Sequence, residues 1–399
     1  MIHAEKIGHR MKSRPVSAGR ALKSSPRPAL LALIAMLLGG VIGLLLAELA
    51  VRIFAPQTLI SDVIAGDPDV NYRLRPNARG RMTSPEYAAD IRINSLGFRG
   101  PEIPLVKKPG VVRVLFLGDS FTFGHGLGEN DTFPFAVGER LEREYPGKFE
   151  VVNGGVYGYS TADELNLFAK YGVALKPDIV VTLFMMNDFA DNPTAYKLGN
   201  DGSLMKQEVS SDFNNSRRIT RFIPGADWLR AHSHLFKFVG VRVLPVLTSG
   251  HAQNSTDDAG PRQAFDEMSP DFYNQKGGSF EITTAILAQL AKIAKENGAR
   301  SVLLTLGGAY EFDNGKIKPA AMLPHERLRR AAAEAGFFRA LALPPLLAEY
   351  RGKDPLFFPV DTHWTAAATR FLAPAVAEVI ARTAADQRKL ERDRFAGGS

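Results

Sequence analysis

The chain has 399 residues, of which 45% are hydrophobic, and it carries a formal net charge of +7 and no cysteine. Residues 1–28 hold seven of its 49 basic and one of its 42 acidic side chains, which leaves a nearly neutral remainder of 42 basic and 41 acidic residues without a basic face for nucleic acid. The absence of cysteine excludes a cysteine nucleophile, a disulfide framework and a thiolate zinc site, while the length is sufficient for a large hydrophobic core.

An uncharged run of nineteen residues, 29–47 (ALLALIAMLLGGVIGLLLA), follows the basic segment 1–28. At about 1.5 Å per residue this run nearly matches the roughly 30 Å hydrocarbon thickness of a bilayer. We therefore predict a single-pass anchor at 29–50 in the cytoplasmic (inner) membrane. Positive charge before the helix would keep 1–28 in the cytoplasm and place the rest on the periplasmic or extracellular side.

A cleaved signal peptide is the competing interpretation of the same run. The apolar stretch is long for a signal-peptide core, and Ala47-Glu48-Leu49 does not form a small-x-small cleavage site. We favour the uncleaved anchor.

The remainder of the chain begins with residues 51–110, which are rich in Pro, Arg, Asn and Gly and are predicted to be a juxtamembrane segment packed on the main domain. From residue 111 onward, apolar β-branched runs alternate with amphipathic helical patterns. The expected strands are 111–118, 149–155, 178–184 and 299–306, and the expected helices are near 132–146, 161–175 and 279–297. Continuous apolar strands are typical of parallel sheets that are covered on both faces.

These patterns predict an α/β fold, a three-layer α/β/α sandwich with a parallel, flavodoxin-like sheet, over residues 111–384. The alternation breaks at about 191–278, which we interpret as an insertion with a lid over the carboxyl edge of the sheet. Its amphipathic part, 228–239, could also contact a membrane surface, so lipid esters remain an alternative substrate. Residues 385–399 are expected to be a polar tail.

A serine nucleophile is suggested at the end of the first strand, where VLFLGDSFTFG turns toward a helix at Ser120. Open α/β sheets place their active sites at this carboxyl edge. A serine hydroxyl needs a base, and His363 lies just before a helix with Asp361 two residues ahead of it to orient the imidazole.

Donors for an oxyanion are expected in two loops at the same edge. Gly158, in the loop after the second strand, could offer its backbone N–H, with Gly154 and Gly155 as competitors. Asn187, after the third strand, could offer its side-chain amide. The candidate groups thus gather at one edge of one sheet.

The order and placement of these segments resemble the blocks of the SGNH (GDSL) hydrolase superfamily over about 111–382. The resemblance is carried by GDSFT at 118–122, the glycine loop ending at Gly158, the pair Asn187-Asp188 and the segment Asp361-Thr362-His363. It implies Ser120 as nucleophile and N–H donor, Gly158 and Asn187 as the rest of the oxyanion hole, and Asp361 with His363 completing the triad. No metal or organic cofactor is implied.

Two departures from the family pattern refine this resemblance. Met185 stands where the third block usually has glycine, and Asp361 precedes His363 by two residues rather than three. The resulting Asp-x-His-Trp block is similar to the alginate O-acetyltransferase branch and to membrane-anchored proteins of envelope polysaccharide metabolism.

The resulting hypothesis is a serine-dependent esterase or deacetylase that acts outside the cytoplasmic membrane on O-acylated envelope or exported carbohydrate. An O-acetyltransferase that uses the same triad is the alternative, and a non-catalytic glycan-binding scaffold is the third reading. The sequence makes no prediction of the oligomeric state.

Four residues near these candidates have structural interpretations, and two of the four could contact substrate instead. Asp119 is expected to stabilise the turn, and Asp188 to cap a helix or bond a neighbouring loop. His125 could touch substrate or be structural, and Trp364 could stack on a sugar or pack under the C-terminal helix.

Overall fold

The computed structural model describes residues 26–54, 63–207, 225, 228–229, 232–239 and 270–396. The chain divides into two compact units, Met1–Pro56 and Gln57–Ser399. The first contains one described helix, and the second contains the sheet and the candidate site.

Helix α1 (Pro26–Phe54) is the described part of the first unit. Its segment Leu30–Phe54 is long and apolar enough to cross a membrane, and none of it is buried within the protein. A signal sequence, which is the competing interpretation, would also be an apolar helix of this kind near the N-terminus. The helix extends beyond the predicted 29–50 at both ends, and Glu48 and Arg52 form an ion pair one turn apart near its carboxyl end.

A five-stranded parallel sheet forms the centre of the second unit, in the order β6-β5-β7-β10-β13. Its strands are β5 (Val112–Gly118), β6 (Phe149–Gly155), β7 (Ile179–Phe184), β10 (Arg300–Thr305) and β13 (Arg339–Ala342). This is the flavodoxin-like order, with a topological switch point between β5 and β7. The predicted fold is confirmed, although β13 was not predicted.

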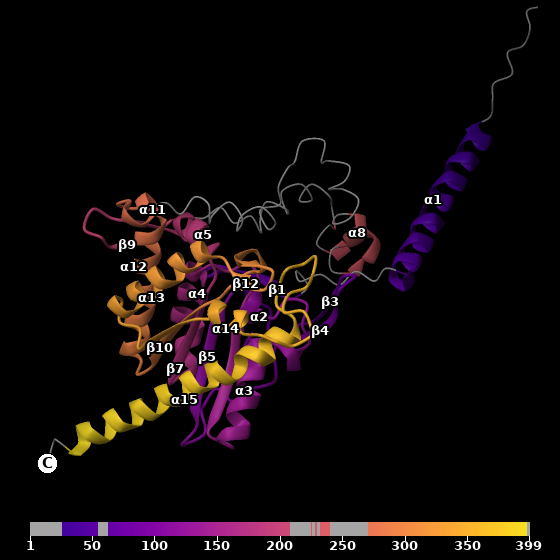
Figure 1. Ribbon diagram of the computed structural model, residues 1–399. Helices are drawn as coiled ribbons and strands as arrows, with labels where there is room; N and C mark the ends of the chain where they lie inside the picture. Colours follow the sequence, from indigo (N-terminus) through magenta and orange to yellow (C-terminus); the bar gives the residue numbers. More distant parts are fainter. Residues whose placement is uncertain are drawn as a thin grey trace, which may run out of the picture. The chain divides into compact units, whose positions relative to one another are not determined.

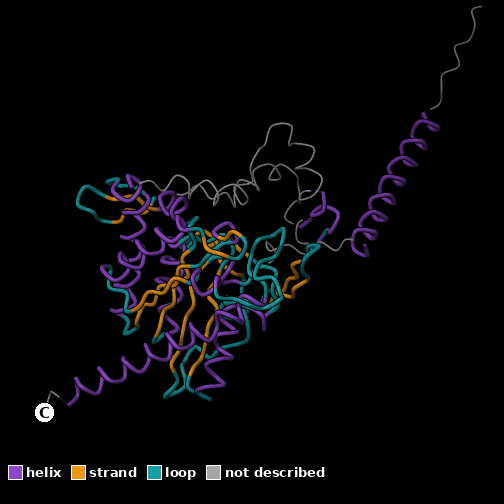
Figure 2. The backbone as a smooth tube through the Cα atoms, viewed as in Figure 1, coloured by secondary structure: helices purple, strands orange, loops and turns teal. Residues whose placement is uncertain are grey.

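Helices cover both faces of this sheet, which explains why its strands are apolar throughout (Figure 1). On β5, Val114 and Phe116 pack toward α3 and α15, whereas Leu115 and Leu117 join the core on the α4 and α12 side. Figure 2 shows the same arrangement, with the strands of the sheet between helical layers. These helices are α3 (Phe133–Glu144), α15 (Ala366–Ala396), α4 (Thr161–Leu167), α12 (Ser279–Glu296) and α13 (Met322–Glu334).

The helix expected at 161–175 is interrupted. It consists of α4, a π-helical turn at Phe168–Gly172 and a 3₁₀ turn at Val173–Leu175. At the other end of the chain, α15 continues to Ala396, so most of the residues expected as a polar tail are helical.

Two antiparallel hairpins precede the sheet in the region expected to be juxtamembrane. They pair β1 (Ile64–Asp67) with β2 (Asn71–Leu74), and β3 (Arg79–Thr83) with β4 (Ala88–Arg92). Buried Arg99 follows them, and its guanidinium donates to the backbone carbonyls of Phe123, Gly124 and Leu127. These bonds attach the N-terminal segment to the loop behind Ser120.

Only part of the predicted insertion 191–278 lies within the described residues. After β7 the chain forms α5 (Asp188–Ala195) and a hairpin of β8 (Tyr196–Leu198) with β9 (Leu204–Lys206), and α8 (His234–Phe238) and α11 (Pro270–Asn274) follow. Most of the predicted lid lies outside the described residues. The remaining short elements are α2 (Ser120–Phe123), α14 (Pro344–Ala348), β11 (Phe312–Asp313), β12 (Lys316–Ile317) and the 3₁₀ turns Glu129–Asp131, Ala309–Glu311 and Pro319–Ala321.

Candidate active site

Ser120 is the first residue of α2, two positions beyond the end of β5, and its side chain is partly exposed. Asp119 caps this short helix by accepting a hydrogen bond from the Phe121 N–H at 2.9 Å, as expected of a turn residue. Gly118 leaves no room for a side chain, because a Cβ there would lie 1.9 Å from Thr122 Oγ1. The tight turn directs Ser120 to the carboxyl edge of the sheet.

Ser120, His363 and Asp361 form a continuous chain of hydrogen bonds. Ser120 Oγ lies 2.7 Å from His363 Nε2, and His363 Nδ1 lies 2.6 Å from Asp361 Oδ1. Since a carboxylate can only accept, the Nδ1–H donates to Asp361 and leaves Nε2 to accept the Ser120 proton. This is the tautomer that a general base for the serine hydroxyl requires.

A tight loop places Asp361 and His363 on the same side in spite of their two-residue spacing. Between them Thr362 adopts a left-handed conformation with φ = 67°, which is uncommon for a non-glycine residue. The Phe358 N–H donates to the His363 carbonyl at 2.9 Å, and the Thr362 N–H donates to the Phe358 carbonyl at 2.9 Å. The loop thereby presents the two side chains to each other.

Trp364, which follows this loop, packs in the core. It is 2% exposed, contacts Phe121 and Phe133 edge-on, and donates its indole N–H to the Gly307 carbonyl at 3.3 Å. Stacking of Trp364 on a sugar ring is therefore wrong, and the packing interpretation holds.

Two residues from the N-terminal hairpins, together with His125 after α2, complete the environment of Asp361. The Tyr87 hydroxyl donates to Asp361 Oδ2 at 2.9 Å, and His125 Nε2 lies 3.1 Å from the same oxygen. The Glu86 carboxylate accepts the backbone N–H groups of Val360 and Asp361, each at 2.8 Å. Burial alone would raise the pKa of Asp361, but hydrogen bonds from His125 and His363 lower it well below the usual range. Asp361 is thus held as a carboxylate.

Tyr87 and Glu86 were not predicted from the sequence, and His125 had two possible roles. The hairpin turn carrying Tyr87 is 274 residues from Asp361 in the chain, and no motif marks it. His125 is only five residues after Ser120, and its contact with Asp361 favours the structural interpretation.

The candidate oxyanion donors lie at the ends of the two strands that flank β5. Gly158 is exposed in the loop after β6 and has φ = 75°, a conformation that favours glycine. Asn187 follows β7, and its amide makes only a long 3.4 Å contact with Asp191. Gly154 and Gly155 have a packing role, because a Cβ at these positions would lie 2.6 Å from the Phe116 carbonyl oxygen and 2.2 Å from Phe123 N.

Three carboxyl groups are buried behind this edge, on Asp119, Glu164 and Asp188. Asp188 accepts a hydrogen bond from Thr161 Oγ1 at 2.6 Å, so it bonds the first residue of α4, whereas the sequence predicted a helix cap or a bond to a loop. Burial raises the pKa of Asp119 to about 6. Burial, followed by repulsion from Asp188 and Asp119, raises the pKa of Glu164 well above its usual range, and burial and Asp119 do the same for Asp188.

Replacing Glu164 by glutamine is therefore expected to raise the melting temperature more at pH 8 than at pH 5. When folding raises the pKa of a carboxyl, the folded protein loses stability as pH rises from the pKa of the unfolded state, about 4.5, toward that of the folded state. Each pKa unit of difference is equivalent to about 1.4 kcal/mol. Glutamine does not titrate and escapes this loss. Thermal melts across this pH range, with the exposed Glu139→Gln on α3 as control, test it. A Glu164→Gln difference that does not vary with pH would contradict the proposed protonation.

A metal ion is the other group that part of this site could hold. Ligand atoms of His125, Asp361 and His363 all lie within 4.8 Å of one another, a set that suits zinc or another transition metal. In the structure these atoms hydrogen-bond directly to each other, and His363 Nε2 faces Ser120. This arrangement suits proton transfer to and from Ser120 better than metal ligation.

A second hydroxyl, histidine and carboxylate are hydrogen-bonded elsewhere in the domain. His325 Nδ1 lies 2.7 Å from Thr305 Oγ1, and its Nε2 lies 3.0 Å from Glu311 Oε2. Thr305 and His325 are fully buried and Glu311 is 1% exposed, whereas His363 and Asp361 expose 19% of their side chains. The buried set cannot meet a substrate, so it joins α13 to β10 structurally.

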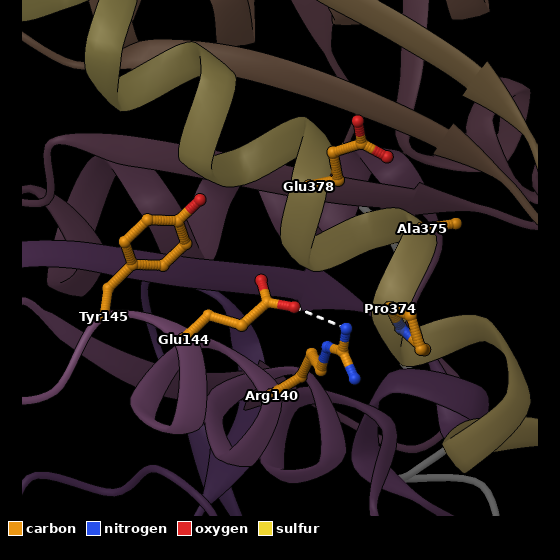
Figure 3. A pocket seen from close by; sticks show the side chains of 6 residues that line it. All are labelled: Arg140, Glu144, Tyr145, Pro374, Ala375 and Glu378. Carbon is orange, nitrogen blue, oxygen red and sulfur yellow. Dashed lines mark ion pairs between the residues drawn. The ribbon is translucent and has the colours of Figure 1, made fainter.

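A recess of about 510 Å³ lies between α3 and α15, and no member of the triad lines it (Figure 3). Arg140 and Glu144 form an ion pair on its α3 side, and Glu378 pairs with Arg382 on α15. Its lining residues are Arg140, Glu144, Tyr145, Pro374, Ala375 and Glu378. Its lining contains no serine and no histidine, so it does not offer the hydroxyl and base found together at Ser120 and His363.

Comparison with known proteins identifies the family of this chain. Residues 116–371, more than half of the chain, match the family described as GDSL-like lipase/acylhydrolase, and the match includes Ser120 and His363. No curated protein matches the chain in sequence.

Several solved structures are similar to this chain at low identity. A catalytic mutant of an acetylxylan esterase from Geobacillus stearothermophilus is 16% identical with a TM-score of 0.37, covering 68% of this chain and 95% of its own. An α/β hydrolase from the metagenome of Lake Arreo is 16% identical with a TM-score of 0.36, covering 66% and 91%. A two-domain esterase active on acetylated mannans is 13% identical with a TM-score of 0.35, covering 68% and 50%.

Proposed function

The chain belongs to the GDSL-like lipase/acylhydrolase family and is an enzyme that acts on ester bonds, and we propose that Ser120 is its nucleophile, His363 its general base and Asp361 the acid of its triad. The observation that carries this proposal is the chain of short hydrogen bonds from Ser120 Oγ through His363 to Asp361 at the carboxyl edge of the sheet. The set of Thr305, His325 and Glu311 has similar hydrogen bonds, but it is buried and therefore closed to a substrate.

The mechanism follows from this geometry. His363 Nε2 accepts the Ser120 proton as Oγ attacks the ester carbonyl carbon, and the imidazolium that forms is stabilised by the Asp361 carboxylate. The N–H of Ser120, the N–H of Gly158 and the amide of Asn187 would bind the oxyanion. His363 then protonates the leaving alkoxide, and an acyl-enzyme remains on Ser120.

The second half of the reaction repeats these steps with a different nucleophile. His363 accepts the proton of a water molecule or a sugar hydroxyl as its oxygen attacks the acyl carbonyl carbon. When the bond from that carbon to Ser120 Oγ breaks, His363 returns the proton to Oγ. Water yields an esterase or deacetylase, and a sugar hydroxyl yields an O-acetyltransferase. The triad serves both, and the Asp-x-His-Trp block at 361–364 is the observation that keeps the transferase as second candidate.

We further propose that the acyl group is acetyl and its carrier a carbohydrate of the envelope or an exported polysaccharide. The support is the similarity of the Asp361–Trp364 block to the alginate O-acetyltransferase branch, together with an apolar helix α1 of membrane-spanning length. In this proposal α1 anchors the chain in the cytoplasmic membrane. The basic segment 1–28 stays inside, and the catalytic unit acts on the opposite side.

The experiment that tests this function measures hydrolysis of p-nitrophenyl esters by the full chain in detergent. We expect acetate to be turned over at least about tenfold faster than octanoate, since a site shaped for acetyl has no pocket for a long chain. Acetylated oligosaccharides should release acetate. Ser120→Ala serves as the control for spontaneous hydrolysis, and a preference for octanoate would overturn the acetyl proposal in favour of lipid esters.

Transfer is separated from hydrolysis by adding unacetylated oligosaccharide to the same reaction. Mass spectrometry of the products shows whether the acetyl group reaches water or the sugar. An acetylated acceptor whose yield rises with acceptor concentration would establish the transferase, and free acetate alone would establish the esterase.

A further inference from the structure

Asp361 is held by two residues that the triad does not include. We propose that Tyr87 and His125 are positioning residues, which fix Asp361 in line with His363 by bonding the carboxylate oxygen that His363 does not use. This inference rests on the proposed function of the triad. It assigns a role in the reaction to the N-terminal hairpins that precede the sheet.

The geometry determines which atoms carry the protons. Tyr87 Oη, His125 Nε2 and Asp361 Oδ2 form a triangle with sides of 2.7, 2.9 and 3.1 Å. Tyr87 has one hydroxyl proton, and the carboxylate oxygen is its stronger acceptor. The contact between Tyr87 Oη and His125 Nε2 therefore requires the proton on the histidine. His125 is the Nε2–H tautomer, and it donates toward both Asp361 Oδ2 and Tyr87 Oη.

His125 is neutral in this arrangement. Its other ring nitrogen, Nδ1, is buried and has no hydrogen-bond partner among the described residues, so a second proton would create an unsatisfied buried donor. Burial also lowers the pKa of His125. Burial and the hydrogen bond to Asp361 raise the pKa of Tyr87, so its hydroxyl keeps its proton.

The neutral state of His125 matters because its ring stacks on His363. The ring centroids are 4.4 Å apart with an interplanar angle of 29°. His363 becomes a cation when it accepts the Ser120 proton, and a second cation at this distance would repel it. A neutral His125 supports the ring of His363 without opposing its charge.

The other polar groups around Tyr87 and His125 have contacts of their own. Glu86 bonds the backbone of the loop, Asp119 caps α2, and Arg99 is occupied by backbone carbonyls. Tyr157 packs against His125 with ring centroids 5.2 Å apart. The variants proposed below leave all four residues unchanged.

Tyr87→Phe removes one donor and keeps the aromatic ring that packs against Phe358. We expect kcat to fall about tenfold with KM unchanged, as for the loss of one hydrogen bond to a charged group. The acidic limb of kcat/KM should move to higher pH, because a carboxylate with fewer donors attracts the His363 imidazolium more strongly. Tyr171→Phe is the matched control, since it removes a tyrosine hydroxyl that donates to Asp67 at 2.6 Å instead.

His125→Phe keeps the stacked ring and removes the Nε2–H, whereas His125→Gln keeps an N–H donor. We expect His125→Phe to lose activity as Tyr87→Phe does and His125→Gln to recover part of it. In an Asp361→Asn background, Tyr87→Phe should have no further effect, because the carboxylate it serves is gone. NMR spectra of the His363 ring recorded across pH in a Ser120→Ala background follow the same change without turnover.

The outcomes separate this inference from the proposed function. If Ser120→Ala is inactive while Tyr87→Phe and His125→Phe keep wild-type kcat, pH profile and His363 titration, the positioning role is overturned and the triad stands. If the losses in Tyr87→Phe persist undiminished in the Asp361→Asn background, the role is also overturned. Ser120→Ala with wild-type activity would overturn both proposals.

Discussion

Ser120→Ala is expected to lower kcat for an ester substrate by about a millionfold. The alanine variant has no oxygen to attack the carbonyl carbon, and His363 then has no proton to accept, so the members of the triad fail together. The substitution removes one partly exposed atom from a helix start that Asp119 caps independently. The expected loss is therefore chemical, with little change in melting temperature, and it is measured with p-nitrophenyl acetate alongside a thermal melt.

Thr365→Ala is a suitable companion to Ser120→Ala, because it removes a hydroxyl that lies two residues after His363 and outside the triad. Its Oγ1 donates to the Pro355 carbonyl and accepts the Ala367 N–H, so its loss affects the start of α15. We expect a lower melting temperature and near-normal turnover. Equal activity losses in the two variants would show that Ser120 acts through folding and not through chemistry.

Asp361→Asn is expected to lower kcat about ten-thousandfold and to leave KM nearly unchanged. Asparagine fits the same space, but its amide can donate to His363 Nδ1, which favours the tautomer with the proton on Nε2. In that tautomer His363 cannot accept the Ser120 proton. Asparagine also carries no charge to stabilise the imidazolium.

A pH–rate profile checks the Asp361 prediction and its cause. Residual activity of Asp361→Asn should rise with pH, since hydroxide can replace the missing general base. The control is Asp354→Asn, an exposed aspartate earlier in the same segment, which should behave as wild type. An Asp361→Asn variant with more than a tenth of wild-type kcat would show that His363 is oriented by another group.

The central sheet was predictable because its strands are apolar on both faces. The runs ending at Gly118, Gly155 and Phe184 have no polar side, which only a strand covered by helices on both sides can accommodate. The last strand, Arg339–Ala342, was missed because it is only four residues long and lies at the edge of the sheet, where burial is partial. The hairpins at 64–92 were missed because they contain no continuous apolar run. In β3 and β4, buried side chains alternate with exposed ones, several of which are charged.

The candidate site was predictable where local sequence dictates the chemistry and hidden where tertiary contacts do. Ser120 follows a buried strand, and the Asp361 and His363 side chains are neighbours in the chain, so position alone suggested them. Tyr87 reaches Asp361 only because Arg99 and the hairpins attach the N-terminal segment to the loop behind Ser120. Contacts across 274 residues leave no local pattern in the chain.

A covalent label from a fluorophosphonate, located by mass spectrometry of peptides, tests the role of Ser120 as nucleophile. We expect one phosphonyl group on Ser120 in the wild type, with proportional loss of esterase activity, and no label in Ser120→Ala or His363→Ala. A label on another residue, or full ester hydrolysis by protein in which Ser120 is fully labelled, would contradict this assignment.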